Sequence, residues 1–246
     1  MRVAVFSDMH GNRFGLDAML GDLRQQPQVD QMVCLGDAIQ GGPQPAETVQ
    51  RLRELNCPVV MGNADAWMLT GVNTGAEGEP SQRQLDVRTW SLSKLSDENQ
   101  NFIRGFQPTV EIDLGGGKKL LCFHGSPTSF DDIILPTTPE EDFMRFLGAY
   151  QPSFMCGGHT HLQQVRRIGD SFFFNPGSVG FAYSHQQPDD DFRADPWAEY
   201  AILTHENGQL GLEFRRVPYD AGEMMAIYAT SGRPYSDEAG AQYKPR

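Results

Sequence analysis

The feature that most constrains the fold is a repeated strand–helix pattern near the start of the chain. Residues 2–7 are predicted to form a buried strand, and the apolar residues that follow recur with helical spacing. A second run at 31–35 precedes a predicted helix that begins at Pro45, and a third run covers 58–61. Strands separated by helices pair in parallel through right-handed crossovers. The pattern therefore predicts an α/β protein.

Polar side chains follow each of these three apolar runs. Asp8 and His10 come after the first run, Asp37 after the second and Asn63 after the third. In α/β sheets, ligands bind beyond the carboxyl ends of the strands. We therefore expect these four side chains to lie close together in one site.

Three further histidines follow apolar runs in the second half of the chain. One comes at the end of a predicted hairpin formed by residues 109–114 and 118–123. The other two follow a predicted strand at 153–156, after two glycines that suit a tight turn. These three histidines are His124, His159 and His161. His185 and His205 lie in polar surroundings, and we expect them to be structural.

The remaining segments fit around this framework. Residues 64–107 are predicted to form a helical insertion beside the site. Thr138 is predicted to cap a helix that has Pro139 at its first position. The later strands favour antiparallel pairing, and a polar tail at about 232–246 closes the chain. The length suits one domain over residues 1–246.

Charge and composition exclude several functional classes. A formal net charge of -12 argues against binding to duplex nucleic acid or to a membrane surface, because either favours clustered Lys and Arg. The first strand leaves no room for a secretory signal, and no apolar run approaches the ~20 residues that span a bilayer. The four cysteines lie in or beside apolar segments without Cys-x-x-Cys spacing, which favours reduced thiols. We expect a cytoplasmic protein with no membrane partner.

The candidate side chains form a mixed oxygen and nitrogen donor set. Such donors suit Mn, Fe, Zn, Ni or Co better than Ca or Mg. A lone aspartate after a strand is more often a cap, and a lone histidine is more often structural, so the argument depends on the whole set. Seven candidates are too many for one ordinary ion, whereas two ions with a bridging carboxylate would use them all. The set is Asp8, His10, Asp37, Asn63, His124, His159 and His161.

The order and spacing of these motifs closely resemble the calcineurin-like metallophosphoesterases over nearly the whole chain. The motif wording is most similar to the small prokaryotic phosphodiesterase-type members. The resemblance implies a four-layer αββα fold, in which a two-sheet β-sandwich is flanked by helices. It also implies that one ion is held by Asp8, His10 and His161, the other by Asn63, His124 and His159, with Asp37 bridging both.

By this resemblance, the chain is expected to be a dinuclear metal-dependent phosphoesterase, and more specifically a phosphodiesterase acting on a small phosphoester. We expect two divalent ions, with manganese first and Fe, Zn, Ni or Co as alternatives. A water that bridges the ions would be deprotonated near neutral pH and attack phosphorus in line. Two other functions remain open, namely a non-catalytic metal-binding scaffold, because a retromer subunit shares this fold, and a protein or dinucleotide-polyphosphate phosphatase.

Three further residues are candidates for less direct roles. Asn12 and Arg13 are explained by turn chemistry and surface exposure as well as by contact with a substrate phosphate. Many relatives place a histidine that assists the leaving group immediately after the Gly-Asn asparagine, where this chain has Ala64. Asp65 could act as the general acid if burial raised its pKa, or it could instead be a first-turn carboxylate of the following helix.

Overall fold

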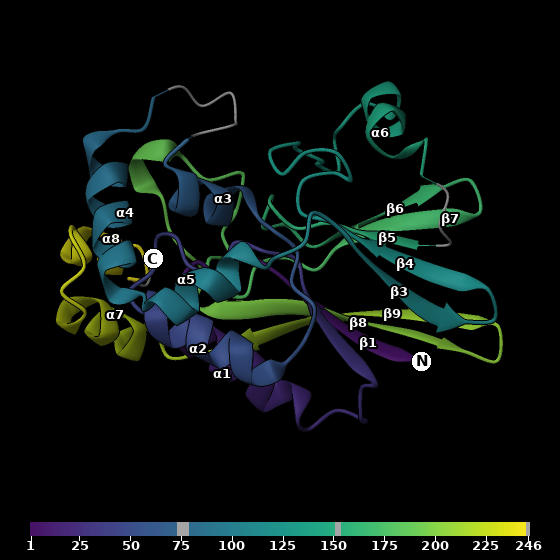
Figure 1. Cartoon of the computed structure of the whole chain (residues 1–246), viewed down its shortest axis with the longest axis horizontal. Helices are drawn as coiled ribbons and strands as arrows, with labels where there is room; N and C mark the ends of the chain where they lie inside the picture. Colours follow the sequence, from purple (N-terminus) through teal and green to yellow (C-terminus); the bar gives the residue numbers. More distant parts are fainter. Residues whose placement is uncertain (73–78, 151–153, 245–246) are drawn as a thin grey trace.

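The computed structural model describes residues 1–72, 79–150 and 154–244. Within these residues the strands form two sheets, which Figure 1 shows packed face to face. The first sheet has the order β2-β1-β8-β9, formed by β1 (Arg2–Phe6), β2 (Gln31–Cys34), β8 (Trp197–Glu206) and β9 (Gln209–Pro218). The second has the order β3-β4-β5-β7-β6, formed by β3 (Val110–Gly115), β4 (Lys118–Cys122), β5 (Phe154–Cys156), β6 (Gln164–Ile168) and β7 (Ser171–Asn175).

Both sheets are mixed. Strand β1 pairs in parallel with β2 and antiparallel with β8, whereas β4, β5 and β7 pair in parallel in the second sheet. The predicted hairpin is the antiparallel pair β3–β4. Of the predicted strand at 153–156, residue 153 lies outside the described residues, and β5 covers the rest. Parallel pairing therefore brings the ends of several strands to the same edge of each sheet.

The predicted third strand at 58–61 is wrong as a regular strand. Val59 bridges Cys34 and Val60 bridges Gln107, each as an isolated pair. Strand β2 ends at Cys34 and the chain then turns, so only one residue of β2 remains to pair with this segment. The segment is extended for long enough to carry the chain to Asn63, at the start of α3.

Alternation along β1 places side chains in two separate layers of the core. Val3 and Val5 belong to a buried cluster that also contains Leu120 and Phe154 of the second sheet, so this cluster lies between the sheets. Phe6 instead packs in the cluster that contains the apolar faces of α1 and α2. Because both faces of β1 are covered, the strand reads as a continuous apolar run.

Helices cover the outer faces of both sheets, which confirms the predicted four-layer αββα sandwich (Figure 1). Those beside the first sheet include α1 (Arg13–Leu23), α2 (Pro45–Leu55) and α5 (Asp97–Arg104). On the second sheet, α6 (Glu140–Leu147) buries Phe143 and Leu147. The others are α3 (Asn63–Thr70), α4 (Gln82–Lys94), α7 (Ala221–Thr230) and α8 (Ser236–Ala241), with a 3-10 turn at Asp189–Asp191. No helix in the described part of the chain is long and apolar enough to cross a membrane.

The predicted cap of α6 is wrong. The N-cap is Pro139, whose side chain makes no capping hydrogen bond. Thr138 Oγ1 instead accepts a hydrogen bond from the backbone N–H of Leu135, 2.8 Å away. A local turn therefore takes the hydroxyl that the sequence pattern assigned to the helix.

The chain end is also more ordered than the polar tail predicted at 232–246, of which residues 245–246 lie outside the described residues. Ala239 on α8 and Tyr243 beyond it are buried against Met224 and Tyr228 of α7. The apolar side chains here are too few to form a helical stripe in the sequence. They are buried because α7 offers them a surface.

Candidate metal centre

The residues predicted as ligands lie together where four strands end. Turns after β1 and β5 supply one group, and turns after β2, β4 and β5 supply another. In each group the candidate ligand atoms lie within 4.8 Å of one another. The first group is Asp8, His10 and His161, and the second is Asp37, His124 and His159. The Oδ1 atom of Asn63 lies 3.0 Å from His124 Nε2, which places Asn63 beside the second group.

The Asp37 carboxylate lies between the two groups. Its Oδ2 atom is 3.4 Å from His124 Nε2 in the second group and 3.6 Å from His10 Nε2 in the first. Its Oδ1 atom accepts a hydrogen bond from the backbone N–H of Ala64, 2.9 Å away, which fixes the orientation of the carboxylate. A carboxylate in this position can contact two ions at once.

Most of the candidate ligands have a left-handed backbone conformation, which directs their side chains toward the site. The φ angles of the residues concerned lie between 47° and 68°, a range that non-glycine residues rarely adopt. Such conformations gather at functional sites, where the surrounding structure enforces them. The five candidate ligands in this conformation are Asp8, His10, Asp37, His159 and His161.

Glycines let the turns approach closely enough to form one site. A Cβ atom on Gly62 would lie 2.1 Å from Asp37 Oδ1, and one on Gly158 would lie 2.2 Å from Ser7 Oγ. The Gly158 turn also brings the backbone N–H of His159 to donate to Asp8 Oδ2, at 3.2 Å. Gly62 and Gly158 are therefore required because a larger side chain would clash with the neighbouring turn.

Backbone carbonyl groups orient three of the four candidate histidines. Each of these rings places Nδ1 against a carbonyl oxygen, which can only accept a hydrogen bond, so Nδ1 carries a hydrogen. The Nε2 atom then faces the centre of the site, the arrangement found in metal-binding histidines. The pairs are His10 with Gln40 (2.9 Å), His124 with Leu35 (2.7 Å) and His161 with Phe181 (2.6 Å).

The atoms that converge on this centre are suited to a cation. The Nε2 atoms of His10 and His161 are 2.9 Å apart, and neither can donate to the other while both rings are neutral with hydrogen on Nδ1. Asp8 Oδ1 is buried without a hydrogen-bond partner among the described residues, 3.3 Å from His161 Nε2. A metal ion would satisfy all three atoms, and the mixed donors fit Mn, Fe, Zn, Ni or Co.

Protons compete with metal ions for the same Nε2 atoms. Burial opposes ionisation of Asp37, but the His124 imidazole holds the pKa of that carboxyl well below its usual range. Burial likewise opposes protonation of His124, yet Asp37 raises the pKa of this histidine to about 10. The pKa of His161 is also raised, because the attraction of Asp8 outweighs burial. Metal binding at these atoms would therefore compete with protonation of the histidines.

Asp65 connects the turn that carries Asp37 to the turn that carries Asn63. Its carboxylate is fully buried and accepts hydrogen bonds from the backbone N–H groups of Ala38 (2.9 Å) and Gly62 (3.4 Å). Burial, and then the charge of Asp37, raise the pKa of Asp65 to about 7. The contacts are those of a first-turn carboxylate that joins the two turns, and the role of general acid stays a prediction.

Asn12 and Arg13 have local contacts. Asn12 is the N-cap of α1, where its Oδ1 accepts from Gly15 N at 2.8 Å and its Nδ2 donates to Gly180 O at 2.9 Å. Arg13 is 45% exposed and pairs with Asp17 at 2.9 Å. The turn and surface interpretations account for these contacts, and contact with a substrate stays a prediction.

Two polar residues at the end of β7 and in the turn after it support the site. Asn175 Nδ2 donates to the backbone oxygen of Gly158 at 2.6 Å, and Ser178 Oγ donates to the backbone oxygen of Asp8 at 2.8 Å. Both side chains are fully buried. The signal available in the sequence is an Asn-Pro-Gly-Ser turn that directly follows an apolar run, like the other motifs of the site.

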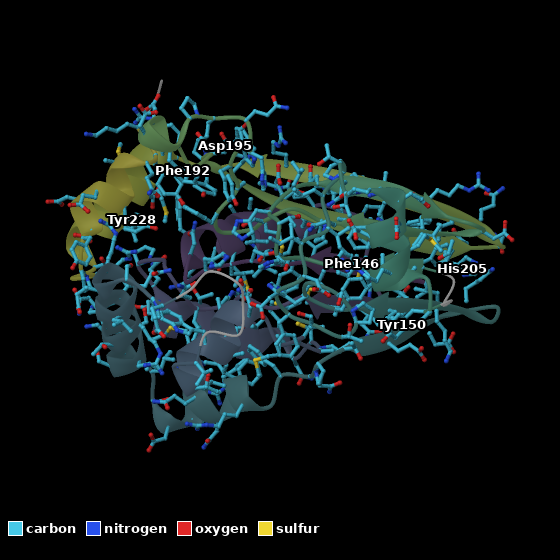
Figure 2. All side chains as sticks on the ribbon, turned by 90° about the horizontal axis from the view of Figure 1, so that it is seen from above. Phe146, Tyr150, Phe192, Asp195, His205 and Tyr228 are labelled. Carbon is cyan, nitrogen blue, oxygen red and sulfur yellow. The ribbon has the colours of Figure 1, made fainter. Side chains whose placement is uncertain are left out.

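The other two histidines make structural contacts. His185 Nε2 lies 2.7 Å from the carbonyl oxygen of Thr160, and His205 Nδ1 lies 3.1 Å from that of Leu114. Figure 2 shows His205 at the end of the molecule opposite Tyr228. His205 is therefore a suitable control for measurements on the candidate ligands.

Residues 1–207 match the family model described as the calcineurin-like phosphoesterase superfamily domain. The chain belongs to this superfamily. Members of this superfamily use divalent metal ions. In this chain the two groups of candidate ligands could hold such ions.

Two relatives match this chain over different fractions of its length. An uncharacterized protein of Methanocaldococcus jannaschii is 28% identical over 231 residues, which cover 89% of this chain and 88% of the relative. The symmetrical bis(5'-nucleosyl)-tetraphosphatase of Erwinia tasmaniensis is 29% identical over 135 residues, covering 54% of this chain and 47% of that protein.

Two solved structures share the calcineurin-like fold along most of the chain. A metallophosphoesterase from Sphaerobacter thermophilus has a TM-score of 0.73 at 24% identity, with 99% of each chain covered. A hypothetical protein from Pyrococcus horikoshii OT3 has a TM-score of 0.80 at 18% identity, with 96% of each covered. These likenesses show the fold.

Replacement of Gly158 by alanine should weaken metal binding. The added Cβ would also lie 2.8 Å from Asp8 Oδ2, so the turn that carries His159 and His161 has to move, at a cost of about 1–3 kcal/mol in unfolding free energy. Metal titration and urea unfolding of Gly158→Ala measure both effects. Gly211→Ala is the matched control, because its nearest contact would be 3.9 Å away. Wild-type metal affinity in Gly158→Ala would contradict the close-packing argument.

Metal binding should release protons, and affinity should fall as the pH falls. At pH 7 His124, with a pKa of about 10, carries a proton that the ion must displace, and the raised pKa of His161 adds to this release. Calorimetric titrations in two buffers of different ionisation enthalpy give the number of protons released. His205→Ala should release the same number as wild type. Equal heats in the two buffers would show that no proton is displaced.

Proposed function

We propose that this protein is a dinuclear metal-dependent phosphoesterase, and more specifically a phosphodiesterase. Membership of the superfamily supports phosphoester hydrolysis. The observation that carries the dinuclear proposal is the position of Asp37 Oδ2, which lies 3.6 Å from His10 Nε2 in the first group and 3.4 Å from His124 Nε2 in the second. Three donors on each side of a shared carboxylate suit two ions about 3.5–4 Å apart.

The chain's own residues would hold the reacting centre in place. Hydrogen bonds from Nδ1 fix three of the four imidazoles, and the Ala64 N–H fixes the bridging Asp37 carboxylate. Bound divalent ions would supply a nucleophilic hydroxide near neutral pH and offset charge on the phosphoryl oxygens. Two such ions outweigh the charge of Asp8 and Asp37, so the site attracts an anionic ester although the chain is acidic.

A dinucleotide-polyphosphate phosphatase is the second candidate. It is favoured by the likeness to the Erwinia tasmaniensis protein, which is named as a tetraphosphatase but matches over about half of its length. A non-catalytic metal-binding scaffold is the third alternative. The three functions differ in what they turn over, so substrate hydrolysis distinguishes them.

Turnover by reconstituted protein tests the proposed function. Metal-free protein is supplied in turn with Mn, Fe, Zn, Ni, Co or Mg, and assayed with bis(p-nitrophenyl) phosphate, p-nitrophenyl phosphate and diadenosine tetraphosphate. We expect the diester to be hydrolysed fastest, with manganese among the activating ions. Faster cleavage of diadenosine tetraphosphate would favour the second candidate. Metal binding without turnover of any substrate would favour the scaffold.

Replacement of the bridging carboxylate should damage both metal sites together. Asp37→Ala should lose both ions and reduce kcat by about 10²-fold or more, because neither ion keeps its full ligand set. His161→Ala should mainly weaken the first site and His159→Ala the second. Metal analysis and turnover of the three variants measure this, with His205→Ala as the control. An Asp37→Ala protein that keeps two ions and full turnover would refute the bridge.

Turnover should depend steeply on the acidity of the leaving group. Ala64 offers no proton donor beside Asn63, and Asp65 is fully buried against backbone N–H groups. A positioned general acid is worth about 10²–10⁴ in rate, and its absence favours leaving groups that depart as anions. A series of aryl phosphodiesters of different phenol pKa measures the slope under conditions where chemistry limits the rate.

The Asp65→Asn variant is the control for this series. It should keep the steep slope and lose about 1 kcal/mol of unfolding free energy, because an amide replaces the carboxylate that accepts two backbone hydrogen bonds. A flat dependence in wild type that becomes steep in Asp65→Asn would make Asp65 the general acid.

A further inference from the structure

A pocket of about 560 Å³ opens beside the first ligand group. His10 and His161 form part of its lining, and Tyr228 of α7, Arg233 and Ala239 of α8 form another part. The family-model match ends at residue 207, so the part of the lining formed by Tyr228, Arg233 and Ala239 lies outside the match. The volume falls within the range of about 300–1,000 Å³ that small-molecule sites occupy.

The pocket is positively charged within an acidic chain. None of the described residues that line it is an aspartate or a glutamate, whereas Arg83 and Arg233 both line it. Arg83 is neutralised by an ion pair with Glu238. Arg233 makes no ion pair with a carboxylate in the part of the chain that the structure describes. A partly buried guanidinium that forms no ion pair favours an anionic ligand, and the charge of Glu238 acts on Arg233 only from beyond ion-pair distance.

Arg233 is fixed in place and is linked to the metal centre through a short stretch of backbone. Its Nε donates to the carbonyl oxygen of Gly41 at 2.6 Å, and Nη1 donates to that of Pro234 at 2.6 Å. Gly41 follows Gln40, whose carbonyl oxygen orients the His10 ring. Among the described residues nothing accepts a hydrogen bond from Nη2, so this donor remains for a ligand.

Aromatic rings line the same pocket and contact one of the candidate ligand histidines. The centroid of Phe181 lies 5.7 Å from that of Phe192 and 6.0 Å from that of His161, and Tyr183 lies 5.4 Å from His161. Figure 2 shows Phe192 and Tyr228 at the same end of the molecule, although they come from different segments. Such a wall suits a planar ring held by stacking or edge contacts.

We propose that this pocket selects phosphodiesters that carry an aromatic ring and, beyond the reacting phosphate, a second anionic group, which Arg233 binds. The chemistry is that of a nucleotide with two phosphate groups. The inference rests on the proposed phosphodiesterase function. The reacting phosphate lies at the candidate metal centre, the ring lies against Phe181 and Phe192, and the second anion accepts from Arg233 Nη2.

Two nucleotide substrates with the same ring and leaving group test the proposal. They are thymidine 5'-(p-nitrophenyl phosphate) and the same compound with a 3'-phosphate, so only the second has the extra anion. Wild type should show a kcat/KM about 10-fold or more higher for the second substrate, the size of one charge-assisted hydrogen bond. Most of this preference should lie in KM, since Arg233 contacts no reacting atom.

Variants of Arg233 should remove that preference. Arg233→Met should bring the kcat/KM ratio of the two substrates close to one, and Arg233→Lys should restore part of it. Arg167→Met is the matched control, because Arg167 Nε also donates to a backbone carbonyl, that of Gly169, but its side chain is exposed on β6. The control should keep the wild-type ratio.

Two results would overturn the proposal. In the first, wild type cleaves both nucleotides equally. In the second, Arg233→Met loses activity to the same degree on both, which would mean that Arg233 only stabilises the part of the pocket lining that α7 and α8 form. If wild type cleaves neither, the proposed function fails, and binding of thymidine 3',5'-bisphosphate then tests the pocket separately. Affinity about 10-fold weaker in Arg233→Met supports it, and equal or absent binding by both proteins refutes it.

Discussion

Two buried carboxylates that converge with four imidazoles are the constraint on which the rest of the structure depends. Asp8 and Asp37 repel each other at short range, and burial raises the free energy of both charges. The cluster persists because positive charge lies between them, either as imidazolium protons or as metal ions. Neutral apolar packing cannot replace that charge, so the site is built for cations.

The two sheets of the sandwich share the task of holding this cluster. The first sheet delivers Asp8 and Asp37 from the adjacent parallel strands β1 and β2, while the second delivers His124 and His161 from β4 and β5. Left-handed turns then direct most of the side chains toward one another, and glycines such as Gly158 let the turns touch. Backbone strain at these turns is offset by the hydrogen bonds that surround them.

The convergence of the candidate ligands at strand ends followed from the sequence pattern, because apolar runs end where polar motifs begin. The four layers and the division of these ligands into two groups came from the resemblance to the calcineurin-like metallophosphoesterases. Features that depend on long-range packing did not follow. Residues 58–61 look like a strand but have only Cys34 of β2 to pair with. The burial of Tyr243 depends on a surface supplied by α7, and the position of Arg233 depends on the carbonyl group of Gly41. No local pattern encodes such contacts.

The proposed dinuclear centre depends on Asp37 joining two metal ions. Anomalous X-ray diffraction from crystals of manganese-loaded protein, collected at the manganese edge, measures this most directly. We expect two anomalous peaks about 3.5–4 Å apart, with the Asp37 carboxylate between them. A single peak, or two peaks that Asp37 does not join, would contradict it.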